Sequence, residues 1–157
     1  MGNRPPHAEM PNASELATYL DELLESQGFP DYPHALNGLQ LANRGTVARI
    51  AAAVDFSSRT IDAVIAAQAN FLILHHGMFW GGAQRITGAV YDRMQLLIAN
   101  DIAVYASHLP LDAHPIAGNC ALLARALDLT PNGRFGQYDG VDIGVAGECD
   151  LLTSTVL

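Results

Sequence analysis

The stretch FLILHHGMFW, residues 71–80, decides the fold and also points to a site. Four apolar residues lead directly into the adjacent histidines His75 and His76, and Gly77 and two aromatic residues follow. Consecutive apolar residues are typical of a strand that is buried on both faces of a sheet. A buried strand that ends in two imidazoles indicates that something binds at its carboxyl end.

Strand and helix patterns alternate on both sides of this stretch. Apart from the strand in 71–76, we expect strands at 47–56, 102–108 and 141–148, and helices at 11–26, 59–70, 88–100 and 117–129. Apolar strands that alternate with amphipathic helices predict a three-layer α/β fold. In such a fold, helices flank a mainly parallel sheet and the crossover connections are right-handed.

Local signals indicate where several elements begin and end. Asn12 and the glutamate three residues later have the spacing of a helix-capping box, and Ser57 or Ser58 can cap the second helix. The residues Pro-Asn-Gly at 131–133 are expected to close the helix at 117–129. Residues 29–40 contain two prolines and a glycine and are therefore predicted to form a loop.

Composition places the chain among single-domain globular proteins. Its 157 residues suffice for one domain, half of them are hydrophobic, and the formal charge is −8. All eight cations are arginines. This acidic balance makes nucleic-acid binding unfavourable but allows an anionic small ligand held by a metal and an arginine. Cys120 and Cys149 have no zinc-finger or disulfide-framework spacing and are interpreted as small core residues.

The two ends of the chain also carry expectations. Residues 1–12 lack the apolar core of a signal peptide and are predicted to be a disordered leader, with the α/β domain at 13–157. No run of the sequence reaches the roughly 20 apolar residues that a membrane-spanning helix needs. We therefore expect a cytoplasmic protein without a membrane partner.

Polar residues follow three of the predicted strands: Asp55 the first, His75 and His76 the second, and His108 and Asp112 the third. Because the carboxyl ends of parallel strands share one edge of a sheet, these side chains should converge there and form a metal site. Successive side chains on a strand point to opposite faces, so His75 and His76 are expected to bind two neighbouring ions, one each, with Asp112 bridging or capping. Paired divalent ions are a common hydrolytic arrangement.

Other interpretations of these residues stay open. Adjacent histidines are more often a satisfied turn or core pair than a set of ligands. Phe79 and Trp80 are expected to form the wall of a pocket or an interface. Arg85 or Arg93 is a candidate for contact with phosphates, although arginines on helix surfaces are more often solvated. His114, which precedes a proline, is expected to be a loop residue.

Four motifs together resemble one known family. LNGLQ at 36–40, LILHHGMFW at 72–80, RITG at 85–88 and VYASHLPLDAHPIAGN at 104–119 follow one another as in the NIF3-like family, also called GTP cyclohydrolase 1 type 2 homologues. The resemblance runs from about residue 14 to residue 148. It implies a toroidal homohexamer and a dinuclear site for divalent metal ions, which could be Zn, Mn, Fe or Mg. It also implies that His75 and His76 each ligate an ion and that Asp112 is a third ligand.

The resemblance implies a metal-dependent hydrolase, and ring-opening hydrolysis of the nucleotide GTP is the activity that the family name suggests. His108 is then the candidate catalytic residue that assists proton transfer. The alternative is a non-enzymatic, ring-forming adaptor or regulatory protein that binds metal. A third possibility is that this chain by itself only folds in part.

The chain departs from the family pattern at its C-terminus. The family's remaining ligands are a histidine and a glutamate in an H-x-x-x-E motif, whereas this chain ends in LLTSTVL at 151–157. We therefore expect the C-terminal half of the family fold to be missing. The chain is then either a fragment of a longer protein or a natural short form that has lost the complete site.

Overall fold

The structure is a computed structural model, and it describes residues 10–150. The helices are α1 (Ala13–Leu23), α2 (Ser58–Ala66), α3 (Ala89–Ala99), α4 (Leu109–Ala113) and α5 (Asn119–Ala126). The strands are β1 (Gly38–Leu41), β2 (Ile50–Asp55), β3 (Phe71–His76), β4 (Ala103–Ala106), β5 (Thr130–Tyr138) and β6 (Val141–Glu148). No helix among residues 10–150 is long and apolar enough to cross a membrane.

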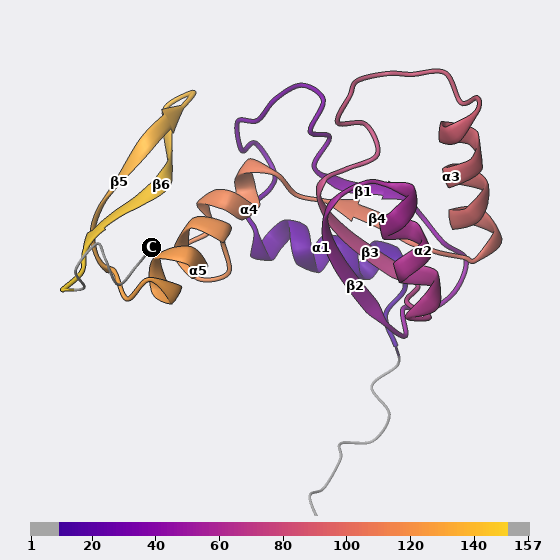
Figure 1. The fold of residues 1–157 in the computed structure, drawn as a ribbon, viewed down its shortest axis with the longest axis horizontal. Helices are drawn as coiled ribbons and strands as arrows, with labels where there is room; N and C mark the ends of the chain where they lie inside the picture. The colour runs from indigo at the N-terminus through magenta and orange to yellow at the C-terminus, as the bar shows by residue number, and fades with distance from the viewer. Residues whose placement is uncertain (1–9, 151–157) are drawn as a thin grey trace, which may run out of the picture.

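Four strands form the main sheet, in the order β1-β4-β3-β2 (Figure 1). β2, β3 and β4 are mutually parallel, and β1 pairs with β4 in the antiparallel direction. The register places His76 beside Asp55 and Leu74 beside Ala106. The three parallel strands therefore end close together at one edge of the sheet, as the alternating pattern predicts.

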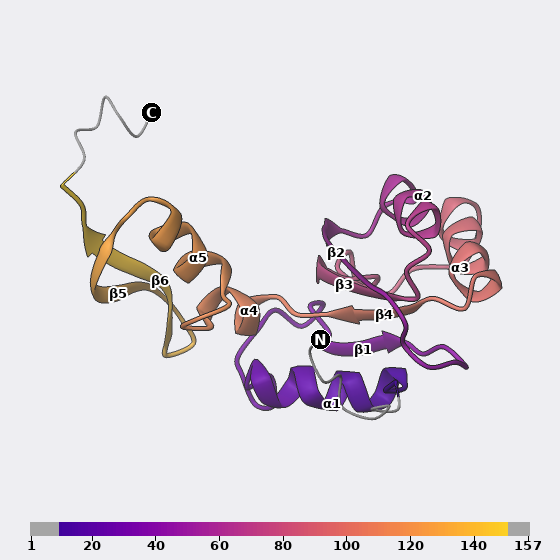
Figure 2. The same ribbon diagram turned by 90° about the horizontal axis from the view of Figure 1, so that it is seen from below.

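Helices cover both faces of this sheet and make the predicted three layers. Figure 2 shows α1 on one face, and α2 and α3 on the opposite face. Alternate residues of the strands supply the two cores, because successive side chains point to opposite faces. Phe71 and Tyr105 pack in the cluster that contains α1, whereas Leu72, Leu74 and Val104 pack in the cluster that contains α2 and α3.

The helix starts predicted from the sequence are confirmed at two places. The Asn12 side chain accepts a hydrogen bond from the Glu15 N–H, and the Glu15 carboxylate accepts one from the Asn12 N–H, which completes a capping box. Ser57, the first of the two candidates, caps α2 by accepting from the Thr60 N–H. Both caps satisfy backbone donors that have no partner inside the helix.

The segment predicted as a loop at 29–40 runs on into a strand. Gly38–Leu41 forms β1, whose pairing with β4 was not expected. Leu39 packs in the α1 core and Leu41 against the opposite one, so this short strand buries a side chain on each face of the sheet. The prolines and the glycine indicated a loop correctly for the first part of the segment, but four residues are too few for a clear strand pattern.

The prediction for residues 130–148 was wrong in its pairing. Residues 141–148 form a strand, but that strand pairs with β5 in a separate two-stranded antiparallel sheet. Pro131 and Gly133 lie inside β5 and do not close α5, which ends at Ala126. Asp139 and Gly140 connect the two strands with φ values of 43° and 86°, the backbone of a tight hairpin turn.

The structure also bears on the expectations for the two chain ends and for the cysteines. Most of the predicted leader, residues 1–9, lies outside the described residues, as do residues 151–157. Pro11 and Asn12 belong to the fold, because the Pro11 carbonyl accepts a hydrogen bond from the Val47 N–H and Asn12 forms a β-bridge with Thr46. The two cysteines are half-buried and do not belong to either core cluster.

Candidate metal centre

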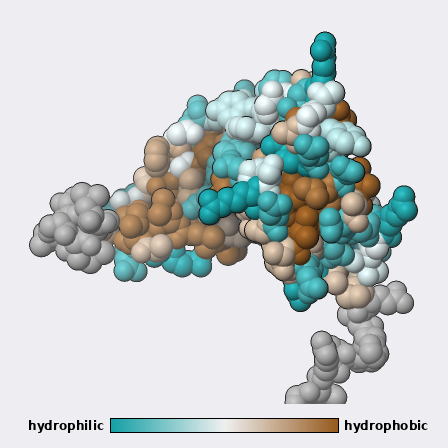
Figure 3. Space-filling model, turned by 45° about the vertical axis from the view of Figure 1, so that its right-hand side comes forward, coloured by the Kyte–Doolittle hydropathy of each residue, from teal (hydrophilic) through white to brown (hydrophobic). Residues whose placement is uncertain are grey.

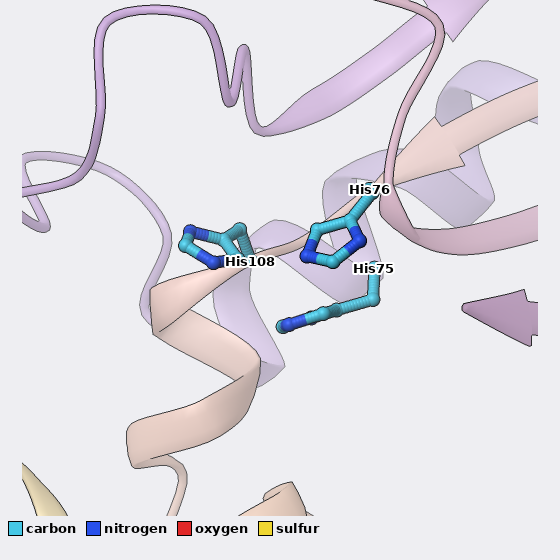
Figure 4. A group of neighbouring side chains, drawn as sticks. All are labelled: His75, His76 and His108. Carbon is cyan, nitrogen blue, oxygen red and sulfur yellow. The ribbon is translucent and has the colours of Figure 1, made fainter. Parts of the chain in front are cut away.

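Three histidines meet beyond the ends of two parallel strands. His75 and His76 are the last residues of β3, and His108 stands directly before α4, two residues after the end of β4. One ring nitrogen from each lies within 4.8 Å of the others, a spacing that allows all three to hold a metal ion. Figure 4 shows the three imidazoles gathered around one space. The predicted convergence of these residues is therefore confirmed.

His108 is held from a loop far away in the sequence. Its Nδ1 lies 2.7 Å from Oδ1 of Asp31, and its backbone N–H donates to Oδ1 of Asn37 at 2.8 Å. Oδ2 of Asp31 accepts two more hydrogen bonds, from the Leu109 N–H at 2.9 Å and from Nδ2 of Asn37 at 2.8 Å. His108 is 6% exposed, so this network fixes a buried imidazole in one orientation.

The same hydrogen bonds set the charge of Asp31. Burial by itself raises the pKa of Asp31, because a charged carboxylate loses solvation inside the protein. Hydrogen bonds from Asn37, His108 and the N–H groups of Leu109 and Tyr32 favour the charged form, and together they lower the pKa below its ordinary value. Asp31 is therefore an anion at neutral pH.

His75 and His76 are each held at Nδ1 as well. Nδ1 of His76 lies 2.7 Å from Oδ1 of Asp55, and Nδ1 of His75 lies 3.2 Å from the Ser107 carbonyl oxygen. A carbonyl or a carboxylate oxygen only accepts a hydrogen bond, so the proton of each neutral ring sits on Nδ1. Each ring then keeps a lone pair on Nε2, the atom left to bind a metal.

Asp112 joins the cluster at His75. Its Oδ2 lies 3.6 Å from Nε2 of His75, and its Oδ1 accepts a hydrogen bond from Nδ2 of Asn119 at 2.8 Å. Ligand atoms bound at about 2.0–2.2 Å around a tetrahedral ion are about 3.3–3.6 Å apart, so one ion can touch both groups. Burial lowers the pKa of His75, and the charge of Asp112 opposes this shift only in part.

The side chains of His75 and His76 were expected to point to opposite faces of the sheet, and this expectation holds only in part. Their ring centroids are 4.7 Å apart and the rings are tilted by 41°. His76 is the terminal residue of β3, so the two rings share the space beyond the strand rather than opposite faces of the sheet. The geometry therefore allows a shared ion as well as one ion for each ring.

Aromatic side chains surround the histidines. Trp80 stacks on His76 with ring centroids 4.3 Å apart, and its indole lies 4.5 Å from the His108 ring. Tyr32 contacts Trp80 and also Tyr138, which is the last residue of β5. The prediction that Trp80 walls a pocket is confirmed in that it borders both the histidines and a cavity.

The contacts of His114 and Gly77 explain why these residues stand near the strand ends. His114 is the C-cap of α4, and its Nδ1 accepts from the N–H groups of Ile116 and Ala117, so it is a turn residue as expected. At Gly77, an added Cβ would lie 2.7 Å from the Cβ of Ala106 and would clash with Gln40. A glycine is required here because the side chains of Ala106 and Gln40 pack closely against its Cα.

Sequence reasoning missed the groups that hold His108. Asp31 and Asn37 lie in the loop before β1, and no spacing rule connects them to a residue after β4. Tyr138 was also missed, because the hairpin that carries it was not predicted. The Asp-Gly dipeptide at 139–140, between two strand-like segments, is the signal that would have identified this hairpin.

Comparisons with known proteins agree on one family. The family model described as Duf34/NIF3 (NGG1p interacting factor 3) matches residues 11–155. A GTP cyclohydrolase 1 type 2 homolog from Deinococcus radiodurans is 47% identical over 133 residues, which are 85% of this chain and 50% of that protein. A second homolog of this name, from Archaeoglobus fulgidus, is 38% identical over 143 residues, 91% of this chain and 58% of that protein.

Solved structures give the same result. The crystal structure of TTHA1606 from Thermus thermophilus superposes on this chain with a TM-score of 0.71 at 41% sequence identity. The match covers 83% of this chain and 53% of the TTHA1606 chain. Reduced HcgD from Methanocaldococcus jannaschii shares the fold at 22% identity, with a TM-score of 0.69. The chain thus spans about half the length of the relatives it matches.

Proposed function

Because this chain belongs to the Duf34/NIF3 family, we propose that it binds two divalent metal ions and supplies part of a hydrolytic site. The proposed ligands are Nε2 of His75, His76 and His108 and the carboxylate of Asp112. Imidazole with carboxylate suits zinc, manganese and iron better than magnesium, which prefers oxygen ligands.

One observation carries this proposal. In all three imidazoles an oxygen acceptor occupies Nδ1, at 2.7–3.2 Å, which leaves Nε2 as the nitrogen outside these hydrogen bonds, and one nitrogen of each ring lies within 4.8 Å of the others. Metal-binding histidines in proteins have this arrangement, because the outer hydrogen bond fixes the ring and raises the basicity of the free nitrogen. Histidines that serve only as turn or core residues are not expected to share this arrangement, with the same ring nitrogen left without a hydrogen bond in all three.

The role proposed for His108 differs from the catalytic role expected from the sequence. Its Nδ1 is held by Asp31, it is 6% exposed, and its ring belongs to the group of nitrogens that can hold an ion. A ligand uses Nε2 continuously, so this atom is not free to carry a proton to and from a substrate. We therefore assign His108 to the metal ligands.

The chemistry that this site supports is hydrolysis. A bound divalent ion supplies Lewis acidity and lowers the pKa of a water molecule into the neutral range. Among the chain's own groups, Asp31 and Asp55 orient imidazoles, and Trp80 and Tyr32 offer aromatic surfaces next to them. Aromatic faces of this kind suit a planar base, which supports a nucleotide substrate such as GTP, the nucleotide in the name of the relatives.

A second candidate is a ring-forming metal-binding adaptor or regulator. Large apolar side chains are exposed around α5 and the hairpin: Ile116 at 67%, Leu123 at 61% and Phe135 at 60%. Figure 3 shows hydrophobic residues gathered at the end of the molecule that carries these elements. Exposed apolar groups mark surfaces that contact other protein, which supports self-association into the homohexamer that the family resemblance implies.

Elemental analysis of the purified chain tests the metal proposal. We expect zinc, manganese or iron to copurify with the wild-type protein and to be absent from a variant in which His75, His76 and His108 are all alanine. His34→Ala is the matched control, because His34 is exposed and outside the cluster. Equal metal content in the triple variant and the wild type would refute the proposal. GTP hydrolysis by a fusion of this chain to the C-terminal half of a relative separates enzyme from adaptor.

A further inference from the structure

We propose that a cavity beside His76 binds a single oxyanion group, a phosphate or a carboxylate, through the guanidinium of Arg93. The cavity has a volume of about 190 Å³, is open to solvent on one side, and is bordered by the ends of β2 and β3, the turn that follows β3, and α3. Its lining includes Asp55, His76, Trp80, Gln84 and Arg93. The inference deepens the proposed function, because the anion would sit next to one of the proposed metal ligands.

Arg93 carries a positive charge that no carboxylate of residues 10–150 pairs with. It is half-buried, and its Nε is enclosed but makes no hydrogen bond within the described chain. No carboxylate of residues 10–150 lies within 4.0 Å of its guanidinium, although the sequence has 16 acidic residues and only eight arginines. A guanidinium without a carboxylate partner is a suitable place for an anion from outside the chain.

The surroundings of Arg93 define where that anion binds. The guanidinium Cζ lies 5.2 Å from the centroid of the Phe56 ring, which covers one face of the group. The two NH₂ groups of the guanidinium make no hydrogen bond to residues 10–150, and a guanidinium edge matches the oxygen spacing of phosphate or carboxylate. The amide of Gln84 lines the same cavity and offers further donors.

One acidic residue on the wall limits the position of the ligand. Asp55 lines the cavity, but its Oδ1 is engaged by Nδ1 of His76 at 2.7 Å. An anion is repelled from this carboxylate and is therefore expected beside Arg93. The hydrogen bond with the neutral His76 ring engages one oxygen of Asp55, and Arg93 is the one cation among the residues that line the cavity.

The size of the cavity decides how much of a substrate it can take. Pockets for drug-sized ligands usually measure about 300–1,000 Å³, so this one accommodates a substituent and not a whole nucleotide. Because His76 forms part of the wall, a molecule anchored here would place its remaining atoms over the histidine cluster. The substrate class inferred is a small molecule with a phosphate or carboxylate close to its reacting centre.

Titration calorimetry with inorganic phosphate and with acetate tests the subsite. We compare the full wild-type chain with Arg93→Met and with Arg85→Met. Arg85 was the other candidate for contact with phosphates, but it is exposed and does not line the cavity, so its variant serves as the control. Each protein is measured metal-loaded and after treatment with a chelator. Arg93→Met should weaken binding of the preferred anion about tenfold or more in both states, whereas Arg85→Met should bind like the wild type.

The outcomes separate the subsite from the metal centre. Preference for phosphate or for acetate identifies the anionic group, and Arg93→Lys, which keeps the charge but loses the planar fork, should recover only part of the affinity. Elemental analysis of Arg93→Met should give the wild-type metal content. The subsite alone would be overturned if anion binding is lost on removal of the metal but is unchanged in Arg93→Met. Equal losses of anion affinity in Arg93→Met and Arg85→Met would also overturn it. Absence of metal from the wild type would refute the proposed function alone.

Discussion

Nδ1 of His108 lies 2.7 Å from Oδ1 of Asp31, a residue 77 positions earlier in the chain. This contact joins the loop before β1 to the end of β4 and determines which imidazole nitrogen faces His75 and His76. Asp31 also accepts from the Leu109 N–H, so it fixes the first residue of α4 and the ring of His108 together. The loop is thereby part of the candidate metal centre, although it contributes no ligand to it.

Asp31→Asn should weaken metal binding without removing a ligand. An asparagine keeps the shape but loses the charge that holds the His108 ring, and loss of such an outer partner commonly lowers metal affinity about 10- to 100-fold. Competition with a chromogenic chelator measures the change. Asp62→Asn, an exposed position on α2, is the matched control and should leave the affinity unchanged. Wild-type affinity in Asp31→Asn would show that this hydrogen bond does not support metal binding.

The same variant should reveal a stability term that depends on pH. The folded-state pKa of Asp31 is below its ordinary value of 3.8, so its contribution is fully present above that pH and is lost as the pH falls through the lowered pKa. At neutral pH, Asp31→Asn should lower the free energy of unfolding by about 1–3 kcal/mol. Chemical denaturation at a series of pH values should show this gap closing below about pH 4. A gap that stays constant in acid would contradict the assignment.

Single substitutions test whether each strand-end histidine binds its own ion. In a version of the protein that is completed by the C-terminal half of a relative, we expect His75→Ala or His76→Ala to lower the metal content by about one ion each, because adjacent residues of a strand send their side chains in different directions. Elemental analysis against His34→Ala provides the count. If either variant keeps its full complement of ions, the assignment of one histidine to each ion is wrong and a shared ion, which the 4.7 Å ring separation also allows, replaces it.

The parts of the site that the sequence predicted follow from a general rule of topology. The convergence of His75, His76 and His108 was predicted because parallel strands end at one edge of a sheet. This prediction needs only the pattern of strands in the sequence. Asp31 could not be found in this way, because a loop residue reaches its partner through tertiary contacts that have no period. β1 was missed for a related reason: a strand of four residues is too short to be distinguished from the loop before it.

The hairpin shows the opposite case, in which a local signal was present and was not used. The turn at Asp139 and Gly140 has positive φ at both residues, so Gly140→Ala should destabilise β5 and β6 by about 1–2 kcal/mol. Gly133→Ala is the control, because neither site has an atom within 4 Å of an added Cβ and only Gly140 has a positive φ. Hydrogen exchange should be faster across residues 130–148 in Gly140→Ala alone. Equal exchange in the two variants would contradict the role of the turn.

The number of donors in this chain leads to the final prediction, which concerns metal stoichiometry. Three imidazole nitrogens and the Asp112 carboxylate are available, whereas two ions with at least four ligands each need about eight positions. We therefore expect the full chain to bind one ion well and a second only weakly, and to hydrolyse GTP no faster than a metal-only control. Calorimetric titration with zinc or manganese measures both sites. A fusion to the C-terminal half of the Deinococcus radiodurans relative should tighten the weaker site, because the family resemblance places the remaining histidine and glutamate ligands there. Two equally tight sites in the chain alone would show that other residues, or a neighbouring subunit, complete the ligand shell.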